Sequence, residues 1–229
     1  MEKEKRLLVI DNSVGDYYKP MNRLPGEDFS MEMDVVNYYR GESVQNLEPY
    51  THIIATGCTK SICEIEPWML KVADLFRSAL ELDLNLLTIC FSHQLLARTA
   101  AGEAWVRRRR EPEFGWVEQE VLEDDPIFGK RGDRIWGFVS HFDEVAAEIL
   151  KDKAVVVLRS HTCGVEAFRV RGKRAWGVQG HFEESPESGA DMLRSICQED
   201  SRLEKWIQNG GNPRDDGYWK VILKRFQAL

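Results

Sequence analysis

The first hundred residues alternate between buried-strand patterns and helical periodicity. Short, almost continuous apolar runs occupy residues 6–11, 33–39, 52–56 and 85–89, and polar or small residues follow them. Runs of this length predict strands that are buried on both faces of a sheet. Before the fourth run, apolar side chains recur at helical spacing over residues 67–82, which predicts an amphipathic crossover helix. This alternation favours a mainly parallel sheet with helices on both faces.

The middle of the chain has a different pattern. Residues 104–109, 115–122 and 134–140 look like strands, and Pro112 and Gly132 lie between them as turn residues. Strands that follow one another without a helix are typical of antiparallel pairing. We therefore expect a small antiparallel or mixed insertion at the edge of the sheet.

The remaining third of the chain returns to the sheet and then becomes helical. The same patterns predict strands at residues 154–159, 165–170 and 174–178, and helices at about residues 186–206 and 213–226. A length of 229 residues with 43% hydrophobic content suffices for one substantial core. We expect a single domain over residues 1–229, with a helical tail from about residue 186.

Charge and hydropathy exclude several classes of protein. Lys and Arg number 31 against 38 Asp and Glu, and the net charge of −7 disfavours nonspecific binding to nucleic acid or to a membrane surface. No apolar run approaches the roughly 20 residues needed to cross a bilayer. Residues 2–6 are charged and lead into a short apolar run, which is not the pattern of a signal peptide. We expect a cytoplasmic protein.

The cysteines and histidines predict neither disulfides nor a metal site. The cysteines are odd in number and scattered, without a C-x-x-C pair, so they are interpreted as reduced thiols. A zinc site needs Cys and His at short spacings, whereas both residue types are spread through the chain. No cofactor or metal is therefore expected. The cysteines are Cys58, Cys63, Cys90, Cys163 and Cys197.

One cysteine occupies a position with chemical meaning. Cys90 follows the strand predicted at residues 85–89 and precedes a helical pattern. A thiol on such a turn lies at the carboxyl edge of a parallel sheet, and the N-terminus of the following helix stabilises a thiolate. This position is that of a nucleophile. The alternative is that Cys90 is simply a small buried hydrophobic residue.

A histidine and a glutamate lie two residues apart after the last predicted strand. Along an extended segment this spacing turns the side chains of His181 and Glu183 to the same side. A glutamate so placed orients the imidazole, which takes a proton from a thiol and returns it to a leaving amine. A surface His and Glu pair is the alternative interpretation.

Both segments resemble motifs of the class I glutamine amidotransferases. The sequence T-I-C-F-S-H-Q is similar to the family's G-x-C-x-G-H-Q, with Cys90, His93 and Gln94 in matching positions and Thr88 and Ser92 in place of the glycines. The sequence G-V-Q-G-H-F-E is similar to G-V-Q-F-H-P-E. His181 and Glu183 match that motif, whereas Gly180 and Phe182 depart from it.

The resemblance implies a fold and a set of site residues. The fold is three-layered and flavodoxin-like, and the catalytic triad is Cys90, His181 and Glu183. The segment I-I-A-T-G-C resembles the family's oxyanion loop I-I-x-S-G-G and contains Gly57 and Cys58. One further segment, S-H-F-D, completes the resemblance. The resemblance assigns Cys58 and Phe91 as oxyanion donors and Gln94 as a contact to glutamine. The S-H-x-D segment is similar to that of free-standing GMP synthase glutaminases. There the resemblance assigns Ser140 and His141 to hold the α-amino and carboxyl groups of glutamine.

The resemblance also implies an activity and leaves alternatives open. A thiolate attacks the side-chain amide of glutamine, and a γ-glutamyl thioester is then hydrolysed with release of ammonia. The ammonia passes to a separate synthetase subunit or is simply released, and the tail docks that subunit, forms a homodimer or caps the fold. A γ-glutamyl peptidase or hydrolase uses the same triad. A catalytically silent binding or regulatory protein on the same scaffold is the third possibility, because both elbow glycines are replaced. The basic run at residues 107–110 is interpreted as a solvated edge or a salt-bridged insert.

Overall fold

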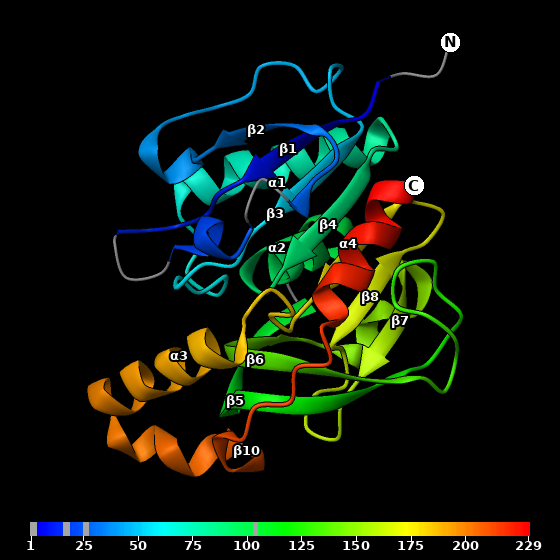
Figure 1. The fold of residues 1–229 in the computed structure, drawn as a ribbon. Coiled ribbons are helices and arrows are strands. Elements are labelled where there is room, and N and C mark those ends of the chain that lie inside the picture. The colour runs from blue at the N-terminus through cyan, green and yellow to red at the C-terminus, as the bar shows by residue number, and fades with distance from the viewer. Residues whose placement is uncertain (1–3, 16–18, 25–27, 103–104) are drawn as a thin grey trace.

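The computed structural model describes residues 4–15, 19–24, 28–102 and 105–229, which form a curled mixed sheet with helices on both faces (Figure 1). The strands of the described residues are ten in number and pair in the order β10-β5-β7-β8-β9-β4-β3-β1-β2, with β6 beside β5. Their bounds are β1 Arg6–Ile10, β2 Glu32–Val36, β3 His52–Ala55, β4 Asn85–Ile89, β5 Val106–Val121, β6 Arg134–Val145, β7 Ala154–Arg159, β8 Ala167–Val170, β9 Ala175–Val178 and β10 Ile207–Gln208.

The central strands are apolar throughout because both of their faces are covered. In β1, Leu8 and Ile10 pack into a core with helices α1 (Pro67–Glu81) and α2 (Phe91–Ala101). The alternate residues Leu7 and Val9 pack on the other side of the sheet, in a core that includes helix α4 (Tyr218–Ala228). Successive side chains of a strand point to opposite faces. The continuous apolar runs of the sequence therefore correspond to a sheet with helices on both sides.

The α/β fold with helices on both faces is confirmed, but the balance of strand directions differs from the prediction. Strands β2, β1, β3, β4 and β9 pair in parallel, and the short β10 is also parallel to β5. Strands β5, β6, β7 and β8 pair antiparallel, and β8 continues antiparallel onto β9. The antiparallel part is thus a large share of the sheet and not a small edge insertion. Local periodicity predicts strands without fixing their partners.

Several predicted boundaries are wrong. The run at residues 33–39 ends as a strand at Val36, and a 3₁₀ helix η3 (Tyr38–Arg40) follows. The two strands expected at residues 104–109 and 115–122 are one long strand, β5, whose pairing shifts register between Arg108 and Glu113. Pro112 lies within this irregularity and not in a turn. Residue 104 lies outside the described residues.

The tail is helical but more broken than predicted. Helix α3 (Pro186–Glu199) ends seven residues before the predicted end, and a 3₁₀ helix, η6 (Ser201–Trp206), follows it. The strand β10 and a short 3₁₀ helix, η7 (Asn209–Gly211), then lead to α4, which begins at Tyr218 and not near residue 213. Figure 1 shows α3 and β10 beside β5 and β6 and α4 against the sheet. Two other 3₁₀ helices are η1 (Pro20–Arg23) and η5 (Ala147–Asp152).

Over the described residues, no helix combines the length and the apolar character that a membrane span requires.

Candidate active site

Cys90 lies on a sharp turn between β4 and α2. Its backbone has φ of 49° and ψ of −105°, in a region that residues with a side chain seldom adopt. Such strain persists only where the surroundings impose it, and it is common at functional sites. The turn places the sulfur at the carboxyl end of a central parallel strand and beside the N-terminus of α2. This is the position that the sequence predicts for a nucleophile.

The residues that replace the family glycines at this turn have dedicated partners. The Thr88 hydroxyl donates to the Trp176 carbonyl at 3.0 Å. The Ser92 hydroxyl donates to the Thr56 carbonyl at 2.8 Å and accepts from the Asn12 amide at 2.8 Å. Both side chains are fully buried. The turn therefore accommodates them without leaving a buried hydroxyl unpaired, and Cys90 itself adopts the positive φ.

His181 and Glu183 follow β9 and converge on the same turn. The His181 Nδ1 atom lies 2.7 Å from the Glu183 carboxylate, and the His181 backbone N–H donates to the Phe138 carbonyl at 2.6 Å. Since a carboxylate only accepts, Nδ1 carries the proton of this contact. Burial lowers the pKa of His181, but the charges of Cys90 and Glu183 and hydrogen bonds with both outweigh it, so that the pKa lies well above its ordinary value.

A cleft of about 700 Å³ opens beside Cys90. Cys58, Phe91 and Ser140 line it together with Cys90 and His181, whereas Gly57 and Glu183 are not part of its lining. Strands β3 and β4 are parallel neighbours with Ala55 opposite Thr88, so the loop that carries Cys58 and the turn that carries Cys90 lie at the same edge of the sheet. The residues assigned to the oxyanion site are therefore brought next to the sulfur.

The second cysteine of the cleft is not activated. Burial, above all, raises the pKa of Cys58 to about 12, and the Cys58 sulfur accepts a hydrogen bond from the Lys60 backbone N–H at 3.4 Å. Cys58 is therefore a neutral thiol at physiological pH. The Phe91 ring stacks on Trp68 with the ring centres 5.5 Å apart, which fixes the first residue of α2.

The comparisons with known proteins agree with this geometry. The family model "Glutamine amidotransferase class-I" matches residues 14–198, which is most of the chain. The chain belongs to the class I glutamine amidotransferase family.

Curated relatives of this class I amidotransferase include archaeal proteins named as glutamine-hydrolyzing subunits of GMP synthase. One from Methanosarcina mazei is 30% identical over 167 residues, which are 73% of this chain and 81% of the relative. Another from Pyrococcus furiosus is 39% identical over 125 residues, which are 52% of this chain and 63% of the relative. A solved glutamine amidotransferase from Thermotoga maritima covers both chains fully, with a TM-score of 0.76 and 21% identity, and this likeness shows the fold.

The amidotransferase residues expected to hold glutamine lie in or next to the cleft. The Gln94 amide nitrogen donates to the Asp143 carbonyl at 3.0 Å and to the Gln179 side-chain oxygen at 3.0 Å. The Ser140 carbonyl accepts from the Cys90 thiol at 3.9 Å. His141 also lines the cleft, but its ring nitrogens face Asp143 and Glu113. The His141 ring is thus engaged within the protein.

The rest of the cleft lining was not predicted from the sequence. Helix α3 contributes one wall with Ser188, Asp191, Met192, Ser195, Ile196 and Glu199. Arg23 and Lys60 also line the cleft, from segments with no motif. No local pattern could have identified the α3 residues, because their place at the cleft depends on how the tail packs against the sheet.

The basic run on β5 is a salt-bridged insert, as one of the two interpretations expected. Arg107 pairs with Glu144 at 2.9 Å, and Arg109 pairs with Glu144 at 2.6 Å. Arg108 has a further place that the sequence did not indicate. Its guanidinium pairs with Asp143 at 3.0 Å, lies over the Phe142 ring and lines the cleft.

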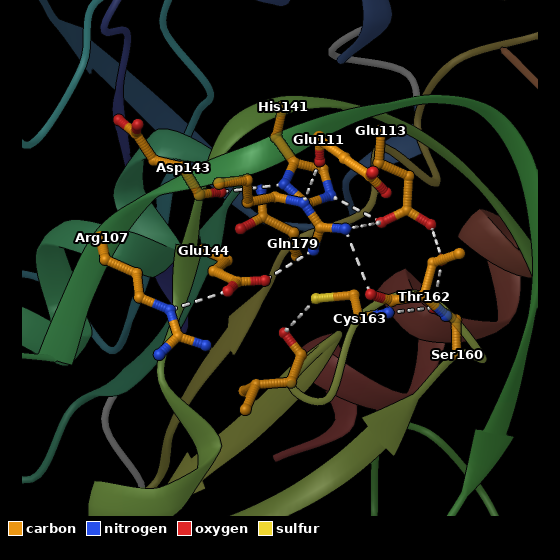
Figure 2. A network of polar contacts seen from close by, with 12 residues as sticks. Arg107, Glu111, Glu113, His141, Asp143, Glu144, Ser160, Thr162, Cys163 and Gln179 are labelled. Carbon is orange, nitrogen blue, oxygen red and sulfur yellow. Dashed lines mark hydrogen bonds and ion pairs between the residues drawn. The ribbon is translucent and has the colours of Figure 1, made fainter. Parts of the chain in front are cut away.

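A second set of Cys, His and Glu is formed by the buried residues Cys163, His141 and Glu113 (Figure 2). One ligand-type atom from each of Glu113, His141 and Cys163 falls within 4.8 Å of the others, and all three residues are buried. Their charges are compensated by the protein: Arg109 lies 3.7 Å from the Glu113 carboxylate, which also accepts from the Thr162 hydroxyl. The residues are of the types that bind a metal, but the adjacent guanidinium opposes a cation at this position.

Proposed function

We propose that the chain hydrolyses the side-chain amide of glutamine through a γ-glutamyl thioester on Cys90. The observation that carries the proposal is the contact of His181 with both Cys90 and Glu183 at the edge of the cleft. A thiolate, an imidazole that holds its proton and a carboxylate that orients the imidazole are the components of nucleophilic acyl transfer.

Each step assigns a role to residues of this chain. The Cys90 thiolate attacks the amide carbon, and the backbone N–H groups of Cys58 and Phe91, with Gly57 shaping the loop, stabilise the oxyanion. His181, oriented by Glu183, gives its proton to the departing ammonia. The same imidazole then takes a proton from water as the water attacks the thioester, and glutamate leaves as the thiol is restored.

The accommodated turn supports activity over a silent scaffold. The replacement of the two elbow glycines was the reason to consider a binding protein without catalysis. Thr88 and Ser92 instead have hydrogen-bond partners, and Cys90 keeps a strained backbone. A scaffold without chemistry has no need of such strain.

A separate synthetase subunit is the proposed receiver of the ammonia. The curated relatives are named as subunits of GMP synthase, and one fold neighbour is titled PurLQS from Thermotoga maritima, at 16% identity and a TM-score of 0.66. The proposal for this chain is a partner in trans at the cleft. A homodimer through the tail stays a prediction, as does the cytoplasmic location, with which five unpaired cysteines are consistent.

The cleft volume favours one second candidate function. A cleft of about 700 Å³ lies in the range of volumes that hold a ligand of drug size. Such a ligand is larger than glutamine. The wall formed by α3 extends the cleft beyond the triad. A γ-glutamyl peptide or conjugate would occupy this extension with the part that follows its scissile bond.

Labelling and turnover test the two functions together. The purified chain is treated with a diazo ketone analogue of glutamine, and the modified peptide is identified by mass spectrometry. Modification of Cys90, absent in Cys90→Ser and unchanged in the exposed-cysteine control Cys63→Ser, supports an enzyme. Ammonia release from glutamine supports the first function, and faster glutamate release from γ-glutamyl dipeptides supports the second. A folded chain with neither labelling nor turnover contradicts both.

A further inference from the structure

Gln179 contacts the nucleophile from inside the protein. It directly follows β9, is fully buried and does not belong to the cleft lining. Its side-chain nitrogen donates a hydrogen bond to the Cys90 sulfur at 3.5 Å. No role follows for this residue from the triad, which uses His181 and Glu183 from the same segment. A buried amide that faces the reacting atom calls for its own explanation.

The orientation of the Gln179 amide is fixed by its neighbours. Gln94 donates from one nitrogen to the Asp143 carbonyl and to the Gln179 oxygen, both at 3.0 Å. A backbone carbonyl only accepts, so the Gln94 nitrogen must face the Asp143 carbonyl. The second hydrogen on the same nitrogen then needs an acceptor, which is the Gln179 oxygen. The Gln179 nitrogen is thereby turned toward the sulfur and not away from it.

The same hydrogen-bond chain continues behind the cleft. The His141 Nδ1 atom donates to the Asp143 carbonyl at 2.9 Å, and the His141 Nε2 atom lies 3.2 Å from the Glu113 carboxylate. Figure 2 shows these residues and Gln179 as parts of one connected network. Glu113, His141 and Gln94 are therefore linked by contacts to the amide that touches the nucleophile. Buried chains of this kind hold each member in one orientation.

The contacts of the sulfur discriminate between its two protonation states. The Ser140 carbonyl accepts from a thiol and offers nothing to a thiolate. The Gln179 N–H donates more strongly to a thiolate than to a thiol, because hydrogen bonds to charged groups are the stronger ones. We propose that Gln179 is a catalytic residue that stabilises the Cys90 thiolate by this hydrogen bond, with Gln94 as its positioning residue. The inference rests on the proposed role of Cys90 as the nucleophile.

The test removes the donor and keeps the volume. In Gln179→Met no hydrogen reaches the sulfur, and in Gln179→Glu a carboxylate faces it. Gln119→Met is the matched control, because Gln119 is equally buried, lies on β5 and has neither amide atom hydrogen-bonded within the described residues. Four quantities are measured: the rate of Cys90 alkylation by iodoacetamide at fixed pH, kcat for glutamine, KM for glutamine, and the thermal unfolding temperature.

We expect both Gln179 variants to slow alkylation of Cys90 about tenfold or more, the magnitude of one hydrogen bond to a charged group. The fall in kcat should match it, with KM unchanged in Gln179→Glu, because its carboxylate still accepts from Gln94 and residue 179 does not line the cleft. Gln179→Glu should be the slower of the two, and Gln119→Met should match the wild type. Wild-type alkylation in a folded Gln179→Met or Gln179→Glu chain would overturn the inference, as would an equal loss in Gln119→Met.

Alkylation separates this inference from the proposed function, because it needs no turnover. A wild type that cleaves neither glutamine nor γ-glutamyl dipeptides, but whose Cys90 alkylation depends on Gln179, supports the hydrogen bond and contradicts the function. Turnover by the wild type, together with Cys90 alkylation that does not depend on Gln179, supports the function and contradicts the role of the hydrogen bond. If Gln179→Met fails to fold, Gln179→Glu supplies the same measurements, since its carboxylate still accepts from Gln94.

Discussion

Two sets of cysteine, histidine and glutamate lie among the described residues, and they differ in backbone strain and in the access of the cysteine to the cleft. Cys90, with His181 and Glu183, lies on a strained turn and lines the cleft. Cys163 and Glu113 are buried and do not line the cleft, which of this set only His141 reaches, and the Cys163 thiol donates to the Val165 carbonyl at 3.6 Å. The residue types are the same in both sets.

The electrostatic environments of the two sets are opposite. Burial, followed by the charges of Glu166 and Glu113, holds the pKa of Cys163 well above its ordinary value, so this thiol stays neutral. At the first set, charge from Cys90 and Glu183 raises the pKa of His181 in spite of burial. The raised pKa of His181 favours a protonated imidazole beside Cys90, whereas the raised pKa of Cys163 favours a neutral thiol. Composition alone therefore does not identify a catalytic site; access, backbone position and neighbouring charge do.

Replacement of each cysteine by serine should give the largest difference in activity between the two sets. Cys90→Ser removes the thiolate and should lower glutamine hydrolysis about 10³-fold or more, as loss of a nucleophile does. Cys163→Ser keeps a small donor next to the Val165 carbonyl and should retain most of the activity. Steady-state ammonia release measures both. Comparable losses in the two variants would mean that the second set takes part in the chemistry.

Replacement of each glutamate by glutamine should give a smaller difference in kcat between the two sets. Glu183→Gln replaces the charged acceptor that orients His181 with a neutral amide and should reduce kcat about 10²-fold. Glu113→Gln leaves Arg109 and His141 without their buried partner and should cost about 1–3 kcal/mol of unfolding free energy, with a milder effect on kcat. Urea unfolding and kinetics on both variants check this. A Glu183→Gln enzyme at full rate would contradict the proposed orientation of His181.

Glu166 offers a stability test of the second region. Both of its carboxylate oxygens are buried outside hydrogen-bonding geometry with any described residue. Burial, followed by the charge of Glu113, raises the pKa of Glu166 well above its ordinary value, and the Ser160 hydroxyl offsets this only in part. The unfolded carboxyl therefore ionises first, and its contribution to stability, present below about pH 4.5, is lost as pH rises toward the folded pKa.

Glu166→Gln should consequently stabilise the fold at pH 7, by about 1–3 kcal/mol, and change it little at pH 4. Urea unfolding at the two pH values measures the difference, and Glu187→Gln, on the exposed first turn of α3, is the control for loss of a carboxyl group. A variant that is less stable than the wild type at pH 7 would show that the charged carboxylate is needed.

The pKa of His181 gives the most delicate comparison. Because Cys90 is among the causes that raise it, Cys90→Ala should lower the pKa of His181, and Cys163→Ala should leave it unchanged. In the wild type, the stability gained from protonated His181 is complete below about pH 6.5 and is lost as pH rises through the folded pKa. NMR titration of the imidazole checks both variants. An unchanged pKa of His181 in Cys90→Ala would show that the Cys90 sulfur does not raise the pKa of the imidazole.

A large part of the candidate site follows from local sequence. The strand before Cys90, the helix after it and the spacing of His181 and Glu183 were all predicted, and the structure brings the three side chains to one place. His93 shows the limit of motif matching. It fits the family pattern, yet burial lowers its pKa to about 3, so it is a neutral core residue.

Features that depend on distant partners were missed or misjudged. The prediction of a small antiparallel insertion failed because alternation along β5 and β6 does not state how many strands join them. Pro112 was interpreted as a turn residue. In the structure β5 pairs with β6 on both sides of Pro112, and only the register of the pairing shifts there. The contribution of α3 to the cleft has no local signal in the tail.

The sequence by itself determined the elements of the central sheet and the identities of the reacting groups, because apolar periodicity and motif spacing act over a few residues. Only the tertiary structure decided which cysteine meets an imidazole at a cleft, which carboxylate meets a guanidinium in the interior, and that Gln179 faces the sulfur. These contacts join residues that lie tens of residues apart. Their energies depend on distance and burial, which the order of residues does not contain.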